Sequence, residues 1–180
     1  MISLEELAQE AAEGDKGAFA RIYEALLEPL YRYFYWNLSS REEAEDLTQE
    51  VFVRCLTHLD AFDRRKASFK SWAFRIAHNL LVDNLRRGRR RAGEEISAEL
   101  ESDQPAVGES LEEEERRRAL RECLLELPSL QRQVLIMKYF ADMGNEEVAR
   151  VLGKTTGAVN ALQHRALRKL GGVLDERGWH

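Results

Sequence analysis

The sequence lacks a long hydrophobic run, a secretory signal and a paired set of cysteines. No apolar stretch in its 180 residues approaches the ~20 residues that a membrane-spanning helix needs, so we expect no membrane insertion. The N-terminus, MISLEELAQEAAEGDKGAF, is acidic and amphipathic rather than basic and then apolar, which predicts a cytoplasmic protein. Cys55 and Cys123 are isolated and have no partner at metal-ligand spacing, which favours buried structural thiols over a redox switch or a metal site.

Motifs of catalysis and of cofactor binding are missing as well. The four histidines lie far apart, no glycine-rich phosphate loop is present, and no pair of carboxylates stands out from the general acidity. A scattered histidine is more typical of a surface or helix-face residue than of a general base or ligand. The sequence therefore predicts a protein that is not an enzyme and that uses no metal and no organic cofactor.

Strand signals are almost absent, whereas helical periodicity is found along most of the chain. We find no sustained alternation of β-branched residues and no Asn-Gly or Asp-Gly hairpin turn. Apolar residues instead recur at three- and four-residue steps, which indicates amphipathic helices. The pattern predicts an all-α fold, with a short leading helix and further helices over about 18–36, 41–59, 69–91 and 120–174.

The formal net charge of −5 hides a strong segregation of charge. Five arginines lie between Arg86 and Arg91 with no acid among them, and ten acids follow between Glu94 and Glu115 with no base. The acidic stretch has little apolar periodicity and is typical of a solvated linker. We therefore predict two small helical domains, residues 1–91 and 116–180, joined by a flexible acidic linker over residues 92–115.

A helix-turn-helix is the sharpest local signal in the second domain. A short helix from Glu146 to Leu152 is followed by Gly153, which can adopt the left-handed backbone of a sharp helix end. Thr155 or Thr156 can then cap a second helix with a hydroxyl group. A glycine-containing turn between two short helices is the helix-turn-helix pattern, although any helical bundle has similar corners.

The two faces of the second helix differ in a way that favours DNA binding. At about 100° per residue its apolar residues cluster on one side. The opposite side is polar and basic, and no acid occurs between Lys154 and Leu174. An ordinary solvated face would mix Glu with Lys and Arg, whereas this face suits a DNA major groove. The outward residues are Asn160, Ala161, His164, Arg165 and Arg168, with Lys154 and Thr156 at the start of the helix.

Two further features of the first domain are open to two interpretations. The arginine run can be a solvated helix end, where cations meet the helix dipole, or a phosphate-tracking patch, which we favour because five arginines exceed what capping requires. Phe62, Phe69 and Trp72 lie in or beside a basic loop and can all be core residues. Of the three, Phe62 is the best candidate for stacking on a base.

Three fragments of the first domain and one of the second resemble the extracytoplasmic-function sigma factors of bacterial RNA polymerase. The first three are GDKGAFARIYEALLEPLYRYFYWNL, AEDLTQEVFVRCLTHLDAF and SFKSWAFRIAHNLLVDNLRR, which resemble region two of that family. The fourth is LPSLQRQVLIMKYFADMGNEEVARVLGKTTGAVNALQHRALRKL, which resembles region four. The resemblance implies core RNA polymerase and promoter DNA as partners, and an anti-sigma factor as a further one.

The resemblance also implies roles for individual residues. In the family, the segment matching Asp46, Leu47, Gln49, Glu50 and Phe52 binds the clamp helices of the largest polymerase subunit, and region four meets the flap. Phe62 and Asn79 match positions at the pocket for a base flipped out of the −10 element, with Arg86 and Arg87 beside them on the DNA. Positions matching Asn160, Ala161, His164 and Arg165 read the −35 element in the family, and Lys154, Thr156 and Arg168 complete the predicted contact set.

Two other functions remain open from the sequence. A free-standing helix-turn-helix regulator would bind duplex DNA without polymerase, but the DLTQEVF segment would then have no role. A protein-only adaptor would not need the outer face from Asn160 to Arg168 to be free of acid.

Overall fold

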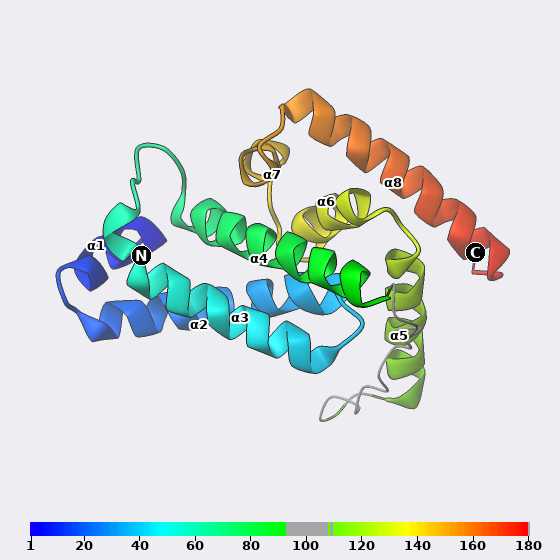
Figure 1. Ribbon diagram of the computed structural model, residues 1–180, viewed down its shortest axis with the longest axis horizontal. Coiled ribbons are helices and arrows are strands. Elements are labelled where there is room, and N and C mark those ends of the chain that lie inside the picture. The colour runs from blue at the N-terminus through cyan, green and yellow to red at the C-terminus, as the bar shows by residue number, and fades with distance from the viewer. Residues whose placement is uncertain (93–107, 109, 180) are drawn as a thin grey trace.

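The computed structural model describes residues 1–92, 108 and 110–179 (Figure 1). Within these residues the chain forms eight α-helices, one 3-10 turn and no strand, which confirms the predicted all-α fold. Most of the predicted acidic linker falls on residues 93–107 and 109, which lie outside the described residues. No helix in the described part of the chain is both long enough and apolar enough to cross a membrane.

The N-terminal region, residues 1–92, consists of α1 (Leu4–Ala12), α2 (Lys16–Asn37), α3 (Arg41–Thr57), η1 (Leu59–Ala61) and α4 (Phe69–Ala92). Each of the first three α-helices begins at a side-chain cap, because a side-chain oxygen accepts from backbone N–H groups that have no partner within the helix. The capping residues are Ser3, Asp15 and Ser40. The polar residues between the apolar stripes therefore determine where these helices start.

The core of this region is made of the apolar stripes that the sequence predicts. Ile22, Leu30 and Phe34 on α2 are fully buried, and α2 packs against α1, α3 and α4. Cys55 on α3 is part of this core, and burial raises the pKa of its thiol to about 12. Cys123 is also buried and free. Both cysteines are thus buried, as predicted, and the raised pKa keeps the Cys55 thiol protonated, which makes it a poor nucleophile and ligand.

The C-terminal region, residues 110–179, contains α5 (Leu111–Leu125), α6 (Ser129–Tyr139), α7 (Asn145–Leu152) and α8 (Thr156–Glu176). Helix α5 begins at Leu111, whereas the sequence predicts that residues 111–115 belong to the linker. The cause is a capping box, in which Ser110 Oγ accepts from the Glu113 amide while the Glu113 carboxylate accepts from the Ser110 amide at 3.0 Å. The acids Glu112, Glu113 and Glu114 are also favourable in the first turn of the helix, where the dipole is positive.

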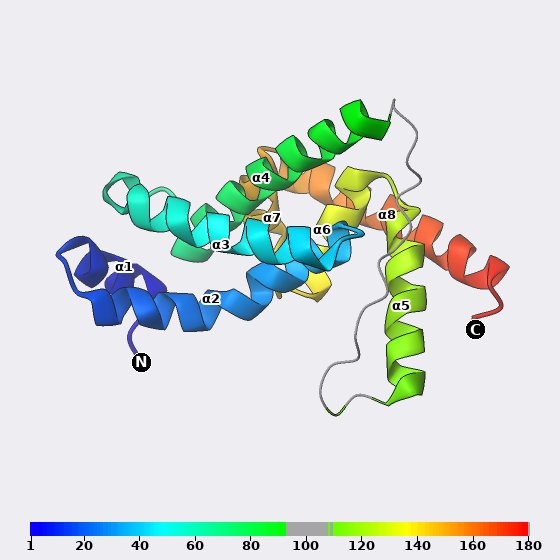
Figure 2. The ribbon, with the colours of Figure 1, turned by 60° about the horizontal axis from the view of Figure 1, so that its bottom comes forward.

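The two regions pack against each other in this structure. The C-terminal half of α2 contacts α5 and α6, and α4 contacts α7, as Figures 1 and 2 show from two directions. Apolar residues of both regions form one continuous buried cluster. Trp36 of α2 and Phe140 after α6 meet across the boundary with ring centroids 4.6 Å apart. We call this boundary the inter-region junction.

One glutamine links three helices at the inter-region junction. Gln133 Oε1 on α6 accepts a hydrogen bond from the Tyr33 hydroxyl of α2 at 3.1 Å and lies 2.7 Å from His78 Nδ1 of α4. Because that oxygen can only accept, the His78 Nδ1 carries the proton and donates it. Burial lowers the pKa of His78 below its ordinary value. The hydrogen bond to Gln133 opposes this shift, and the charges of Arg75 and Lys154 add to it. The neutral imidazole is therefore the form that fits this junction.

Two buried arginines of the C-terminal region meet the end of α2. Arg121 donates from Nε and Nη2 to the Leu38 carbonyl at 3.2 and 2.7 Å. Arg132 donates from Nε to Asn37 Oδ1 at 3.2 Å, and burial lowers the pKa of its guanidinium to about 10. Cations are favourable at a helix C-terminus, where carbonyl groups lack partners within the helix. The C-terminal region thus completes the end of an N-terminal helix.

Candidate nucleic-acid interface

Helices α7 and α8 form the helix-turn-helix that the sequence predicts. Gly153 ends α7 with φ 62°, the left-handed conformation expected for it. Thr155, rather than Thr156, caps α8, because its hydroxyl accepts from the Ala158 amide at 3.1 Å. Gly144 caps α7 without a side chain of its own, and the Glu147 carboxylate accepts from the Gly144 amide at 3.0 Å. The backbone of both helix starts is therefore well defined.

Helix α8 has the two faces that the helical wheel predicts. Val159, Leu162 and Ala166 are buried against the rest of the C-terminal region. All residues of the predicted −35 contact set are exposed. They are Lys154, Thr156, Asn160, Ala161, His164, Arg165 and Arg168. The structure therefore leaves the whole set accessible along α8, whose residues up to Leu174 include no acid, and we call this surface the recognition face.

Asn160 on the recognition face is held by residues of two other helices. Lys138 Nζ of α6 donates to Asn145 Oδ1 of α7, and Asn145 Nδ2 donates to Asn160 Oδ1. Asn145 Nδ2 also lies 3.5 Å from Gln163 Oε1, and Gln163 Nε2 donates to the Tyr139 hydroxyl at 3.1 Å. The sequence does not single out Lys138, Asn145 and Gln163, because their contacts with one another and with Asn160 depend on how the three helices pack.

His164 and Arg168 lie one helical turn apart on the recognition face. Arg168 Nη2 is 3.5 Å from His164 Nε2, at the outer limit of hydrogen-bond distance. Because the guanidinium can only donate, His164 accepts at Nε2 in this contact. Both side chains remain exposed, and both offer N–H donors to the exterior of α8.

Phe62 in the N-terminal region is a core residue to a greater extent than expected. The sequence leaves both a core role and a base-stacking role open for it, and in the structure its ring packs on Phe69 and Trp72 with centroids 5.1 and 5.4 Å away. The side chain is half-buried, so one part of it remains accessible. Asn79 is exposed on α4.

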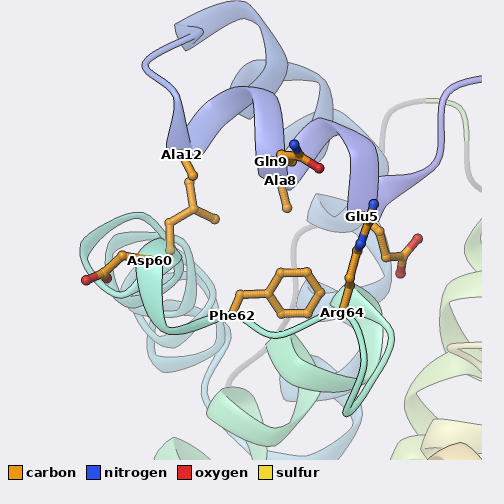
Figure 3. Close-up of a pocket in the computed structure, with 8 residues that line it drawn as sticks. Glu5, Ala8, Gln9, Ala12, Asp60, Phe62 and Arg64 are labelled. Atoms are coloured by element: carbon orange, nitrogen blue, oxygen red, sulfur yellow. The ribbon is translucent and has the colours of Figure 1, made fainter.

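A small cavity lies beside Phe62, between α1 and η1 (Figure 3). Its volume is about 200 Å³, and Figure 3 shows the Phe62 ring pointing into it below Ala8 and Gln9 of α1. Asn79 is not among the residues that line it. The lining residues are Glu5, Ala8, Gln9, Ala12, Leu59, Asp60, Phe62 and Arg64. The structure therefore gives Phe62 a neighbouring space, which it does not share with Asn79.

The arginine run forms the exposed end of α4. Arg86, Arg87, Arg89, Arg90 and Arg91 are all exposed, and the last three lie in the final turn of the helix. Arg87 Nε bonds the Asp83 carbonyl one turn earlier at 3.4 Å. Most of the positive charge is thus directed to solvent, where it is available to an anionic partner.

The predicted core-binding segment lies on α3, and two of its five residues are exposed. Asp46 and Gln49 are exposed, while Leu47 and Glu50 are half-buried. Phe52 is only 5% exposed, because its ring packs on Tyr23 with centroids 4.5 Å apart. Phe52 therefore supports this surface from the core side and exposes little of its own ring to a partner.

An exposed apolar patch extends the same surface and was missed from the sequence. Val53 and Leu56 on α3 are 58% and 56% exposed, and Tyr23 and Leu27 on α2 are 38% and 36% exposed. In the sequence, these residues could have been recognised as apolar side chains at helix positions outside the buried stripe. Val53 and Leu56 lie one turn apart on α3 and are therefore neighbours, and adjoining exposed apolar side chains are typical of a surface that a partner covers.

Both regions match known families. The family described as Sigma-70 region 2 matches residues 22–91, and the family described as Sigma-70, region 4 matches residues 117–170. Sigma factor BldN of Streptomyces coelicolor is 34% identical over 177 residues, which cover 95% of this chain and 66% of BldN. SigD of Mycobacterium tuberculosis is 32% identical over 178 residues, covering 93% and 82% of the two chains. SigW of Bacillus subtilis is 29% identical, covering 89% and 92%.

Solved structures agree with these matches. CnrH in complex with the cytosolic domain of CnrY superposes with a TM-score of 0.67 at 27% identity, covering 94% of this chain and 96% of CnrH. The sigma factor RpoE in complex with the anti-sigma factor NepR, from Bartonella quintana, superposes with a TM-score of 0.74 at 23% identity, covering 87% and 96%. On the relatives and the two matched regions together, this chain belongs to the extracytoplasmic-function sigma factors of the sigma-70 family.

Proposed function

We propose that the chain binds core RNA polymerase and directs it to promoters that carry −10 and −35 elements. The observation that supports this most is the combination, in one chain, of an acid-free recognition face on α8 with a partner-binding surface on α3. As a sigma factor the chain acts as a specificity subunit. We further propose that it has no catalytic activity of its own and works in the cytoplasm together with the polymerase.

The recognition face reads the −35 element as duplex in the major groove. Asn160 and His164 lie near its centre and contact base edges, while Arg168, farther along α8, contacts phosphate. Phosphate contacts fix the position of the protein on DNA, and base-edge contacts supply the sequence preference. Arg165 lies beside His164 and can serve either role.

The −10 element is bound by the N-terminal region as it opens. The half-buried Phe62 ring has a cavity of about 200 Å³ beside it, and an aromatic ring stacks on an unpaired base with little regard to its identity. Asn79 contributes a polar group from the exposed side of α4. Arg86 and Arg87 hold the phosphates of the same DNA.

Core polymerase is bound through α3. The acidic residues Asp46 and Glu50 and the amide of Gln49 adjoin the patch of Val53 and Leu56, so polar and apolar contacts lie side by side. Such a mixture of an apolar centre and a polar margin is usual for protein–protein interfaces.

The inter-region junction must separate for both elements to be bound at once. Elements about 25 base pairs apart are ~85 Å apart along B-DNA at 3.4 Å per base pair. A compact chain of this length has a radius of gyration of about 16 Å, so its packed form is too small to reach both. The packed arrangement is therefore the form of the free chain, and promoter-bound polymerase holds the regions apart. An inhibitor protein, as RpoE has in NepR, would act by favouring the packed form.

Run-off transcription on a promoter library tests the proposed function. Purified chain is mixed with core polymerase, and the 5′ ends of the transcripts are sequenced. We expect transcripts that start at fixed positions downstream of a shared pair of elements and that are absent without the chain. A free-standing regulator would instead bind duplex promoter DNA without core polymerase and would leave core unable to initiate at those positions.

A further inference from the structure

The amide of Asn160 is oriented by a chain of hydrogen bonds that reaches it from α6 and α7. We propose that Lys138 and Asn145 are positioning residues that turn the Asn160 Nδ2 donors, and not its Oδ1 acceptor, toward the −35 bases. This inference rests on the proposed role of α8 in reading DNA and adds which bases Asn160 accepts.

The direction of these hydrogen bonds, from Lys138 through Asn145 to Asn160, follows from the donor and acceptor groups alone. A lysine ammonium has three donors and no acceptor, so the oxygen of Asn145 faces Lys138. The nitrogen of Asn145 then faces Asn160, which meets it with oxygen. Reversing either amide would bring two donors together, so the arrangement has a single satisfied orientation.

The residues that orient Asn160 lie on packed helices rather than on a loop. Lys138 and Asn145 are half-buried, and α6, α7 and α8 contact one another. Gln163 adds a second acceptor for the Asn145 amide and is itself bonded to Tyr139. The orientation of Asn160 is therefore set before DNA arrives.

An asparagine in this orientation selects bases by their acceptors. The usual asparagine–adenine pair needs both amide atoms, one donating to N7 and one accepting from the N6 amino group. In this chain Oδ1 faces the Asn145 amide, so it is not turned toward a base, and the pair cannot form in its usual two-bond geometry. Guanine offers two acceptors, O6 and N7, and cytosine offers an amino donor. We expect Asn160 to prefer guanine and to reject cytosine at the position that it contacts.

The substitution Asn145→Asp reverses the donors and acceptors in this series of hydrogen bonds and so tests the inference. A carboxylate accepts from Lys138 and has no donor left, so Asn160 must turn its Nδ2 inward and expose Oδ1. An acid at the first position of α7 is favourable to the helix dipole, so the variant should fold. Bases that offer an amino group, cytosine or adenine, should then gain about tenfold over guanine at this position, measured by sequencing −35 elements selected from a randomised pool by holoenzyme.

Two companion variants make the result decisive. Lys138→Arg keeps a side chain that only donates, and it should retain the guanine preference within about twofold. Asn160→Ala should abolish the preference at this position in both the parent and the Asn145→Asp background. An unchanged preference in Asn145→Asp, with Asn160→Ala still altering it, overturns the positioning role alone. If Asn160→Ala changes nothing, α8 does not read this base, and the proposed function of the recognition face fails instead.

Discussion

The C-terminal region presents its candidate DNA contacts on an open helix face, whereas the N-terminal region keeps its aromatic candidate half-buried. Asn160, His164 and Arg168 are exposed on α8, and one of them is oriented by residues of α6 and α7. Phe62 instead packs on Phe69 and Trp72 at the edge of a small cavity.

The difference corresponds to two kinds of DNA. Duplex edges are accessible without distortion, so a fixed helix face can read them. A base inside the duplex has to leave the stack before a protein can hold it, at a cost of a few kcal/mol. We therefore expect the α8 contacts to act in the first encounter and Phe62 to act once the strands separate.

Substitution of the apolar patch on α3 should have the largest effect on function. Val53→Asp combined with Leu56→Asp places two charges where we propose a desolvated contact, and loss of such a contact costs at least ~2 kcal/mol. Affinity for core polymerase, measured by fluorescence anisotropy, should fall at least ~30-fold. Glu115→Ala, on the exposed side of α5, should bind core normally. Equal binding by the two variants would place the core-binding surface elsewhere.

Phe62→Ala should separate the two stages of promoter binding. Open-complex formation, detected by permanganate reactivity, should fall about tenfold, while closed-complex binding changes little, because stacking contributes ~1–3 kcal/mol. Phe62→Leu keeps an apolar side chain against Phe69 and Trp72, so it reports the loss of the aromatic ring with less loss of packing. A pre-melted template should rescue both variants. Without rescue, Phe62 has no part in strand opening.

The recognition face should divide into specificity and affinity. His164→Ala should change the preferred base at one −35 position by ~1–3 kcal/mol, seen in the same selection experiment as above. Arg168→Ala should weaken binding to all sequences alike and reduce the salt dependence by about one counterion. If His164→Ala weakens every sequence equally, its imidazole contacts phosphate and not a base.

The smallest effect concerns pH and the inter-region junction. The pKa of His78 is lowered in the packed form, so packing releases a proton, and the stabilisation is fully present above the ordinary pKa of about 6.5. It is lost as the pH falls through 6.5 toward the lowered value. Fluorescence energy transfer between dyes on Glu24 and Lys169 should therefore show less packing at pH 5.5 than at pH 7.5. His78→Asn, which cannot titrate, should remove the difference.

The sequence predicted the local features of both regions well. Gly153 and Thr155 determine helix ends through their own backbone or side chain, and the buried and exposed faces of α8 follow from its periodicity. The interactions across the inter-region junction could not be predicted. Arg132 and Gln133 are polar residues on a helix, which indicates solvent exposure in a sequence, yet both are buried by contacts with residues about 95 and 100 positions away.

The candidate sites were predictable to the extent that they depend on one helix. The recognition face lies on α8 alone, so its residues were found together. Phe52 and Phe62 were assigned to contact surfaces, but their burial depends on Tyr23, Phe69 and Trp72, which approach them only in the folded chain. The orientation of Asn160 could not be predicted either, because it depends on Lys138 and Asn145, which lie on other helices.

The contact between Arg121 and the Leu38 carbonyl has a consequence for the end of α2. A carbonyl at a helix end has no partner within the helix, and here its partner comes from another part of the chain. When the regions separate, that oxygen is left to water, and the last turn of α2 frays more readily. Amide hydrogens near Asn37 should then exchange faster with solvent deuterium, so this short turn serves as a built-in reporter of how often the chain opens.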